Sequence, residues 1–190
     1  MIIDPEKHQR LSVRLKEYGC SQPSAYFVTI CSWLRGSIFG EIINGKMELN
    51  EFGIVVEREC LNNIKVLPNI KLDQFVVMPN HVHGIVFINR RGEVASPKIN
   101  AQQTLPKGWE GSSLHKPTLG QIVAYYKYMT TKQINIIRNT PGMPVWQRNY
   151  FEHVIRDEND LKNTREYILN NTLRWAFDKN NPLNIQVDPW

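Results

Sequence analysis

The stretch "VVMPNHVHGIVFI", residues 76–88, places two histidines inside an otherwise apolar run. Two β-rich segments, residues 70–78 and 81–88, meet here through Pro79 and Asn80, which suit the two central positions of a tight turn. The pattern therefore predicts two neighbouring antiparallel strands. Because both faces of each segment are mostly apolar, we expect central strands that are covered on both sides.

His81 and His83 flank a single valine in the second segment. Side chains along a strand alternate between its faces, so the two imidazoles share one face, about 7 Å apart along the strand axis. This spacing lets both histidines bind one ion, provided that a third ligand comes from elsewhere in the fold. Two partly buried histidines that hydrogen-bond to carbonyls or carboxylates explain the pair equally well.

Other motifs that carry chemistry are absent from the sequence. There is no HExxH helix, CxxC pair, Walker A loop or GxGxxG turn. The zincin, zinc-ribbon and nucleotide-binding classes therefore have no support.

Upstream of the histidines, the pattern predicts a strand, a hairpin and a helix. Residues 25–33 are rich in β-branched and aromatic side chains, as strands are. Asn44 and Gly45 lie between two short apolar stretches and favour a type I′ hairpin, in which both central residues adopt positive φ. Asn50 is placed to cap a helix that Pro68 ends.

Downstream, residues 89–117 lack periodicity and are rich in Gly, Pro, Ser and Lys. Segments of this kind are long loops, either functional or disordered, and we expect a flexible one here. Thr118 and Gln121 then form the capping-box pattern of a new helix.

The end of the chain predicts one more strand and one more helix. The strand is expected over residues 145–156, and the helix begins at Asp157 or Asn159 and runs to residue 178. Two helices between the strands are too few for a doubly wound parallel sheet. The order of elements predicts an α+β fold with helices against one antiparallel sheet.

Composition fits one domain over residues 1–190, with a basic N-terminal extension, 1–24, and the long loop, 89–117. The 190 residues are 42% hydrophobic, and 23 Lys and Arg exceed 18 Asp and Glu to give a net charge of +5. An excess of this sign favours a polyanionic partner such as nucleic acid, although many basic proteins bind none.

Nothing in the sequence indicates export or membrane insertion. The N-terminus lacks the apolar region of a secretion signal, and no apolar run approaches the roughly 20 residues that span a bilayer. Cys20, Cys31 and Cys60 have no metal-ligand or redox spacing, which fits reduced thiols. We expect a soluble cytoplasmic protein with no membrane partner.

The final predicted helix carries a polar stripe. Tyr167, Asn171 and Arg174 lie at positions i, i+4 and i+7, beside an apolar stripe that contains Ile168. Such a stripe borders the buried face, so it can meet the sheet surface that carries the histidines. A boundary tyrosine with a solvated amide and guanidinium is the competing interpretation.

Taken together, these residues resemble the single-tyrosine HUH transposases, specifically the REP-associated tyrosine transposase branch. The resemblance covers nearly the whole chain and follows the order of motifs in that family. It runs through "RLKEYGCSQPSAYFVTIC", "IFGEIINGKMELNEFG", "VVMPNHVHGIVFI", "LGQIVAYYKYMTTKQIN", "VWQRNYFEHVIRDENDL" and "YILNNTLRW".

The resemblance implies roles for the histidines and for the last helix. The motif His81, Val82, His83 is expected to bind Mg²⁺ or Mn²⁺, Asn171 to complete the metal site, and Tyr167 to act as the nucleophile. It also implies a ferredoxin-like or RRM-like sheet and a transposase that cuts and rejoins single-stranded or hairpin DNA through a 5′ phosphotyrosine. Such a protein would be prokaryotic, nucleoid-associated, and a monomer or a homodimer.

Two positions depart from the family pattern. Thr172 stands where the family commonly has proline. The loss of this proline would alter the geometry of the helix but would leave the metal ligands unchanged. Gly19 and Cys20, with Ser24, replace an Asp-Tyr pair and a glycine near the N-terminus, which affects any DNA contact made there.

Basic and aromatic side chains are candidates for DNA contact through phosphates and stacked bases. Each is also explained as an ordinary surface, boundary or core residue. The basic candidates are Arg10, Arg14, Lys16, Lys127, Lys132, Arg148, Arg156 and Arg174, and the aromatic ones are Tyr125, Tyr128 and Trp109.

Two other functions remain open from the sequence. An RRM-like module with an inactive metal site would bind single-stranded nucleic acid without cutting it. A metal-dependent nuclease or phosphodiesterase would use water as the nucleophile and leave Tyr167 a structural role.

Overall fold

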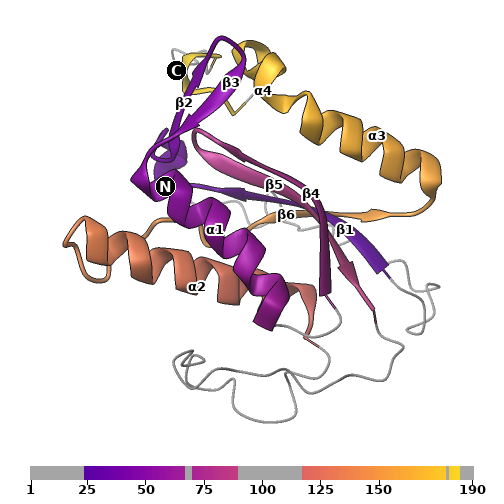
Figure 1. Cartoon of the computed structure of the whole chain (residues 1–190), viewed down its shortest axis with the longest axis horizontal. Helices are drawn as coiled ribbons and strands as arrows, with labels where there is room; N and C mark the ends of the chain where they lie inside the picture. The colour runs from indigo at the N-terminus through magenta and orange to yellow at the C-terminus, as the bar shows by residue number, and fades with distance from the viewer. Residues whose placement is uncertain (1–23, 67–69, 90–116, 179, 185–190) are drawn as a thin grey trace, which may run out of the picture.

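A four-stranded antiparallel sheet forms the centre of the protein, in the order β4-β5-β1-β6 (Figure 1). The computed structural model describes residues 24–66, 70–89, 117–178 and 180–184. The strands are β1, Ser24–Cys31; β4, Ile70–Met78; β5, His81–Ile88; and β6, Phe151–Ile155. The predicted α+β class, with one antiparallel sheet, is confirmed.

The tight turn at Pro79 and Asn80 joins β4 to β5, as predicted. Met78 pairs with His81 across this turn, and β5 pairs with β1 on its other side. In that second pairing Thr29 lies opposite His83, and Cys31 lies opposite His81. Both histidines therefore belong to a central strand, where side chains on each face meet a packed layer.

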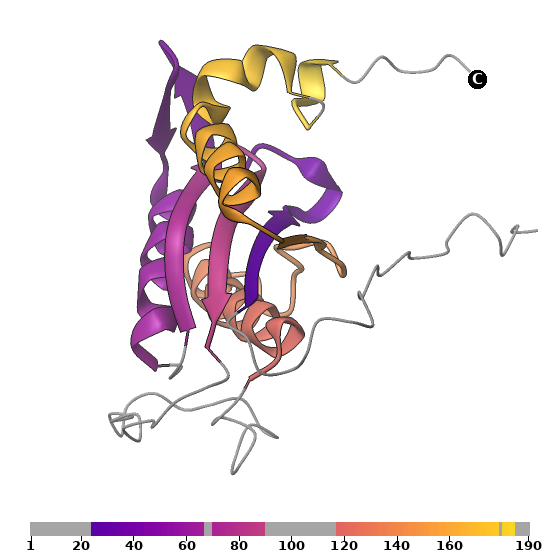
Figure 2. The same ribbon diagram turned by 90° about the vertical axis from the view of Figure 1, so that its right-hand side faces the viewer.

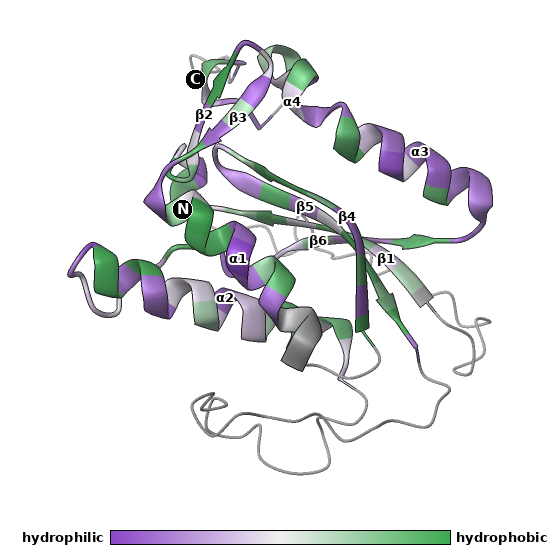
Figure 3. Ribbon diagram, viewed as in Figure 1, coloured by the Kyte–Doolittle hydropathy of each residue, from purple (hydrophilic) through white to green (hydrophobic). Residues whose placement is uncertain are grey.

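Helices cover both faces of the sheet (Figures 1 and 2). Helices α1, Glu51–Val66, and α2, Leu119–Ile137, pack on one face, where Val28, Ile30 and Val82 join their core. Helix α3, Glu158–Leu169, packs on the other face through a smaller core that includes Ile85. In Figure 3 the apolar strands lie between these layers, whereas α3 is largely hydrophilic.

The helix caps confirm the predicted starts. Asn50 Oδ1 accepts the backbone N–H groups of Phe52 and Gly53, both at 3.0 Å, at the start of α1. Thr118 and Gln121 form the capping box of α2 in both directions. These bonds satisfy amide groups that have no partner within the first helical turn.

The Asn44-Gly45 hairpin forms a separate two-stranded sheet. Strands β2, Gly40–Ile43, and β3, Lys46–Leu49, are joined by Asn44 with φ 52° and Gly45 with φ 75°. Positive φ at both positions is what a type I′ turn requires, so the predicted hairpin is confirmed. The hairpin lies beside the short helix α4, Asn171–Arg174, near the end of the chain (Figure 1).

The expected continuous helix from residue 157 or 159 to 178 is wrong. Helix α3 ends at Leu169, and Asn170 separates it from α4 and from the 3₁₀ turn at Trp175–Phe177. The side chain of Asn170 donates to the carbonyl of Glu166 at 2.9 Å. The backbone of Asn170 leaves helical geometry, with φ −92° and ψ 3°, although its N–H still bonds to the carbonyl of Glu166, and this change of geometry marks the break.

The last strand is shorter than the predicted segment 145–156. Only Phe151–Ile155 forms β6, while Trp146 makes an isolated antiparallel bridge to Ser32. Lys127 Nζ donates to the carbonyls of residues 147 and 149, at 2.8 and 2.9 Å, and so holds the intervening bend against α2. These carbonyls bond to an ammonium group instead of to a neighbouring strand.

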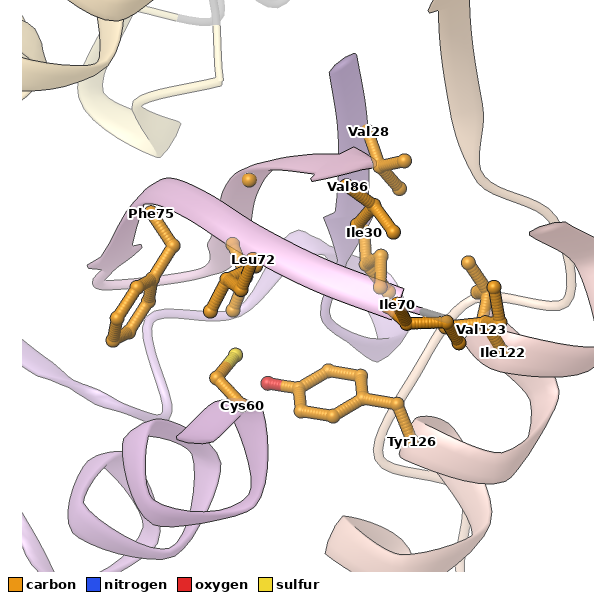
Figure 4. A pocket seen from close by; sticks show the side chains of 12 residues that line it. Val28, Ile30, Cys60, Ile70, Leu72, Phe75, Val86, Ile122, Val123 and Tyr126 are labelled. Carbon is orange, nitrogen blue, oxygen red and sulfur yellow. The ribbon is translucent and has the colours of Figure 1, made fainter. Parts of the chain in front are cut away.

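An apolar cavity of about 70 Å³ lies between the sheet and helices α1 and α2 (Figure 4). Gly84 forms part of its wall on the sheet side, and Cys60 and Tyr126 reach it from the helices. Tyr126 is buried, and so is Tyr125, which the sequence offered as a candidate for stacking on bases. Burial raises the pKa of the Cys60 thiol to about 12, so this cysteine stays protonated at neutral pH.

The extension 1–24 and the loop 89–117 fall, apart from their end residues, outside the described residues. Within the described ranges, no helix has both the length and the apolar character needed to cross a bilayer.

Candidate metal and tyrosine site

His81 and His83 converge at the end of β5 nearest the turn. Their side chains project from the sheet face that α3 covers, and the two residues are 0% and 2% exposed. The Nε2 atoms of the two imidazoles lie 3.0 Å apart. The predicted shared face therefore brings the two potential ligand atoms to one point.

A buried amide determines the tautomer of His81. The Nδ2 atom of Asn80 donates to the carbonyls of Arg35 and Asn180, at 2.9 and 2.7 Å. Its Oδ1 atom must therefore be the acceptor for His81 Nδ1, 2.8 Å away, so Nδ1 carries the proton and Nε2 keeps its lone pair. Second-shell bonds of this kind orient histidine ligands of metals.

Burial also keeps His81 in the form that binds metals. The pKa of His81 is lowered to about 4, chiefly by desolvation and to a smaller extent by the charge of Arg35, while the carboxylate of Asp178 opposes both effects. The imidazole is thus neutral at pH 7, and only a neutral imidazole can ligate a cation.

His83 is held by its cross-strand neighbour. The Oγ1 atom of Thr29 lies 2.8 Å from His83 Nδ1, and the ring of Phe27 stacks on the imidazole with centroids 5.2 Å apart. A hydroxyl both donates and accepts, so Thr29 accommodates either neutral tautomer. His83 can therefore donate its Nε2 proton to His81, or present a second lone pair to a cation that both histidines share.

Tyr167, on α3, points its hydroxyl at the histidines. The oxygen lies 3.4 Å from His83 Nε2, and the residue is 37% exposed. Arg165, two positions earlier, forms a bidentate ion pair with Asp73 of β4, at 2.6 and 3.1 Å, which holds α3 against the sheet. Burial raises the pKa of Tyr167, and a hydrogen bond from Asn171 counteracts this effect.

Asn171 reaches the same site from the first residue of α4. It is 2% exposed, and its Oδ1 atom is buried without a hydrogen-bond partner. An unsatisfied buried oxygen costs about 1–3 kcal/mol, so a bound ion or water is one explanation for such an atom in a folded protein. An amide oxygen beside two neutral imidazoles fits the ligand set of a divalent cation.

Asp178 is a site residue that the sequence interpretation missed. Single ligand atoms of His81, His83 and Asp178 lie within 4.8 Å of one another, and no other such group of three occurs in the described part of the chain. The sequence pattern places Asp178 at the end of the last predicted helix, where helical spacing gives no reason to choose it as a ligand. Only the break at Asn170 and the turns after it bring it to the histidines.

A row of aromatic rings leads from the edge of the sheet to the site. Phe151 on β6, which is 59% exposed, contacts Phe27 edge to face, with centroids 6.3 Å apart. Phe27 makes a similar contact with Tyr167, at 5.8 Å. The sequence interpretation did not single out Phe151, because its exposure depends on β6 being an edge strand.

The predicted DNA-contact residues are scattered. Arg10, Arg14, Lys16 and Trp109 lie outside the described residues. Arg148 and Arg156 are exposed on either side of β6, and Arg174 is exposed at the end of α4. Lys132 and Tyr128 are exposed on α2, which packs on the sheet face opposite the histidines, and Lys127 is bonded to backbone carbonyls.

Comparison with known proteins places the chain by fold and by family. No family model matches the chain. Its fold is transposase-like, because it superposes with a TM-score of 0.53 on a REP-associated tyrosine transposase solved bound to a REP hairpin. That match covers 82% of this chain and 70% of the transposase, at 16% sequence identity.

A sequence relative shows the family. An uncharacterized protein from Haemophilus influenzae is 39% identical over 176 residues, which cover 90% of this chain and 93% of the relative. The chain belongs to the family of that Haemophilus influenzae protein.

Proposed function

We propose that the protein is a metal-dependent single-stranded DNA endonuclease and strand transferase, a transposase of the single-tyrosine HUH type that acts at or near DNA hairpins. The observation that carries the proposal is the contact of the Tyr167 hydroxyl with His83 Nε2, at 3.4 Å, beside the paired Nε2 atoms. It joins a potential nucleophile to a potential metal site.

Tyr167 is the proposed nucleophile. Its phenol oxygen attacks the phosphorus of a phosphodiester, a bond to the 5′ phosphate forms, and the bond to the 3′ oxygen breaks. The proton lost by the phenol balances the one gained by the 3′ oxygen, which leaves a free 3′ hydroxyl. Because the phosphotyrosine keeps the energy of the broken bond, a second strand can be joined without ATP.

His81, His83 and Asn171 are the proposed ligands of Mg²⁺ or Mn²⁺. The lone pair of His81 Nε2 and the unpaired Oδ1 of Asn171 support this set. A bound divalent cation would act as a Lewis acid and a template for the scissile phosphate. The hydrogen bond from Asn171 to Tyr167 also links the ligand to the nucleophile and opposes the rise in the pKa of the phenol.

Single-stranded or hairpin DNA is the proposed substrate. The net charge of +5, the exposed ring of Phe151 and the exposed arginines on either side of β6 support a polyanion with unpaired bases. The REP-associated transposase of similar fold was solved bound to a REP hairpin, which favours the same class of DNA. In this proposal residues 1–190 act as one domain, as a monomer or a homodimer.

The test is a cleavage assay with end-labelled, hairpin-containing single strands and Mn²⁺, resolved by denaturing electrophoresis. We expect a nicked product with a free 3′ hydroxyl and a protein–DNA adduct that survives SDS, and weak activity on a perfect linear duplex. Nicking without an adduct would identify a nuclease that uses water. Binding without nicking would identify an inactive single-strand-binding module.

A further inference from the structure

The carboxylate of Asp178, which follows α3 and α4 in the chain, lies close to the histidine pair. Asp178 follows the 3₁₀ turn at Trp175–Phe177, and one of its oxygens lies within 4.8 Å of a ring nitrogen of each of His81 and His83. Asp178 is only partly exposed, unlike a carboxylate that extends freely into solvent.

The local backbone fixes the direction of this carboxylate. Asp178 Oδ1 accepts the backbone N–H of Asn180 at 2.6 Å, and the Asp178 carbonyl accepts that of Asn181 at 3.0 Å. With one oxygen held by the turn, the second has few directions open to it. Metal-ligating carboxylates are commonly oriented by hydrogen bonds of this kind.

The segment that carries Asp178 is anchored to the same amide that orients His81. Asn80 is 1% exposed, and its Nδ2 donates to the Asn180 carbonyl at 2.7 Å while its Oδ1 accepts from His81 Nδ1. Arg35 adds a second tie, from its guanidinium to Asn180 Oδ1 at 3.1 Å. The buried side chain of Asn80 therefore holds both His81 and the turn that follows Asp178.

The charge of the site favours a carboxylate ligand. Two neutral imidazoles and an amide oxygen bring no negative charge to a divalent cation. Mg²⁺ and Mn²⁺ are bound by sites rich in oxygen ligands, in which carboxylates predominate. Asp178 would supply the negative charge that the other three ligands lack, together with a second oxygen donor beside that of Asn171.

We propose that Asp178 is a ligand of the divalent cation, held in position with His81 through Asn80. This inference rests on the proposed function, because it concerns the same metal site. It adds a ligand that comes from the turn after α4, and it extends the site beyond both α3 and α4.

The test is calorimetric titration of the full-length protein, free of metal, with MnCl₂. Asp178→Asn and Asp178→Ser should each weaken Mn²⁺ binding at least about tenfold. Both replacements keep a side-chain oxygen for the N–H of Asn180, so circular dichroism should show wild-type folding in EDTA. Asp178→Glu keeps a carboxylate and should retain part of the Mn²⁺ affinity. The control is Asp160→Asn, which changes a carboxylate bound to His153 and should leave the Mn²⁺ affinity unchanged.

The possible failures separate the two proposals. Wild-type affinity in Asp178→Asn and Asp178→Ser, with binding lost in His81→Ala, would overturn the role of Asp178 and leave the histidine site intact. A wild-type protein that binds no Mn²⁺ would overturn both the role of Asp178 and the proposed metal-dependent function.

Discussion

The Nε2 atoms of His81 and His83 lie 3.0 Å apart, and the Nδ1 atom of each imidazole faces a buried side-chain oxygen. Since Asn80 Oδ1 accepts a hydrogen bond from the Nδ1–H of His81, the Nε2 atom of His81 keeps a lone pair that points toward His83. A buried pair with this geometry either shares one proton between the rings or shares one cation. The second possibility gives the pair a function.

Removal of either imidazole should abolish both metal binding and cleavage. In His81→Ala and His83→Ala we expect the loss of measurable Mn²⁺ affinity in calorimetry and a fall in nicking to background, with DNA affinity largely retained. The matched control is His153→Ala on β6, whose ring bonds to Asp160 at 3.0 Å. Unchanged Mn²⁺ affinity in the double mutant of His81 and His83 would show that these histidines do not bind the metal.

The histidine geometry was predictable because it depends only on the period of a strand. The break at Asn170, in contrast, depends on the backbone angles of one residue, φ −92° and ψ 3°, and helical periodicity does not report these. Asn171 still reaches the site, but as the first residue of α4 and not as part of the helix that carries Tyr167.

The partners of the histidines were beyond prediction for a different reason. Thr29 lies opposite His83 only because β1 pairs with β5 in one particular register. The segment that carries Asp178 is held near the histidines by the bond from Asn80 to Asn180, 100 positions away in the chain. Contacts of this kind are set by tertiary packing, and no local pattern in the sequence encodes them.

Phe151 is expected to stack on an unpaired base next to the site. Phe151→Ala should weaken binding of single-stranded DNA by about 1–3 kcal/mol, roughly 5- to 150-fold, in a fluorescence anisotropy titration. Phe151→Trp should retain the affinity. The control is Tyr128→Ala, which removes an exposed ring of α2 on the other side of the sheet and should have no effect. Weaker DNA binding in Tyr128→Ala, with unchanged binding in Phe151→Ala, would show that the DNA lies along α2 instead.

Gly84 offers a test of the cavity between the sheet and helices α1 and α2. A Cβ added there would lie 3.6 Å from atoms of Leu72 and Phe75, in ordinary van der Waals contact. Gly84→Ala should therefore raise the free energy of unfolding by about 0.4–1 kcal/mol, because alanine reduces the freedom of the unfolded chain. Denaturant titration measures this change.

Gly53 provides the contrast, because a Cβ there would lie 2.1 Å from the carbonyl oxygen of Phe39. Gly53→Ala should lower the stability in the same titration. A destabilised Gly84→Ala protein would mean that the space beside Gly84 is already filled.

Tyr167→Phe tests the nucleophile most directly, since it removes one oxygen atom and leaves the ring against Phe27 and His83. Folding, Mn²⁺ affinity and DNA affinity should persist, because the lost hydroxyl contacts only the site. Nicking and the SDS-resistant adduct should disappear, as the attacking atom is gone. Tyr128→Phe, which alters an exposed tyrosine of α2, should nick at the wild-type rate. A Tyr167→Phe protein that still cuts at that rate would show that water or another tyrosine is the nucleophile.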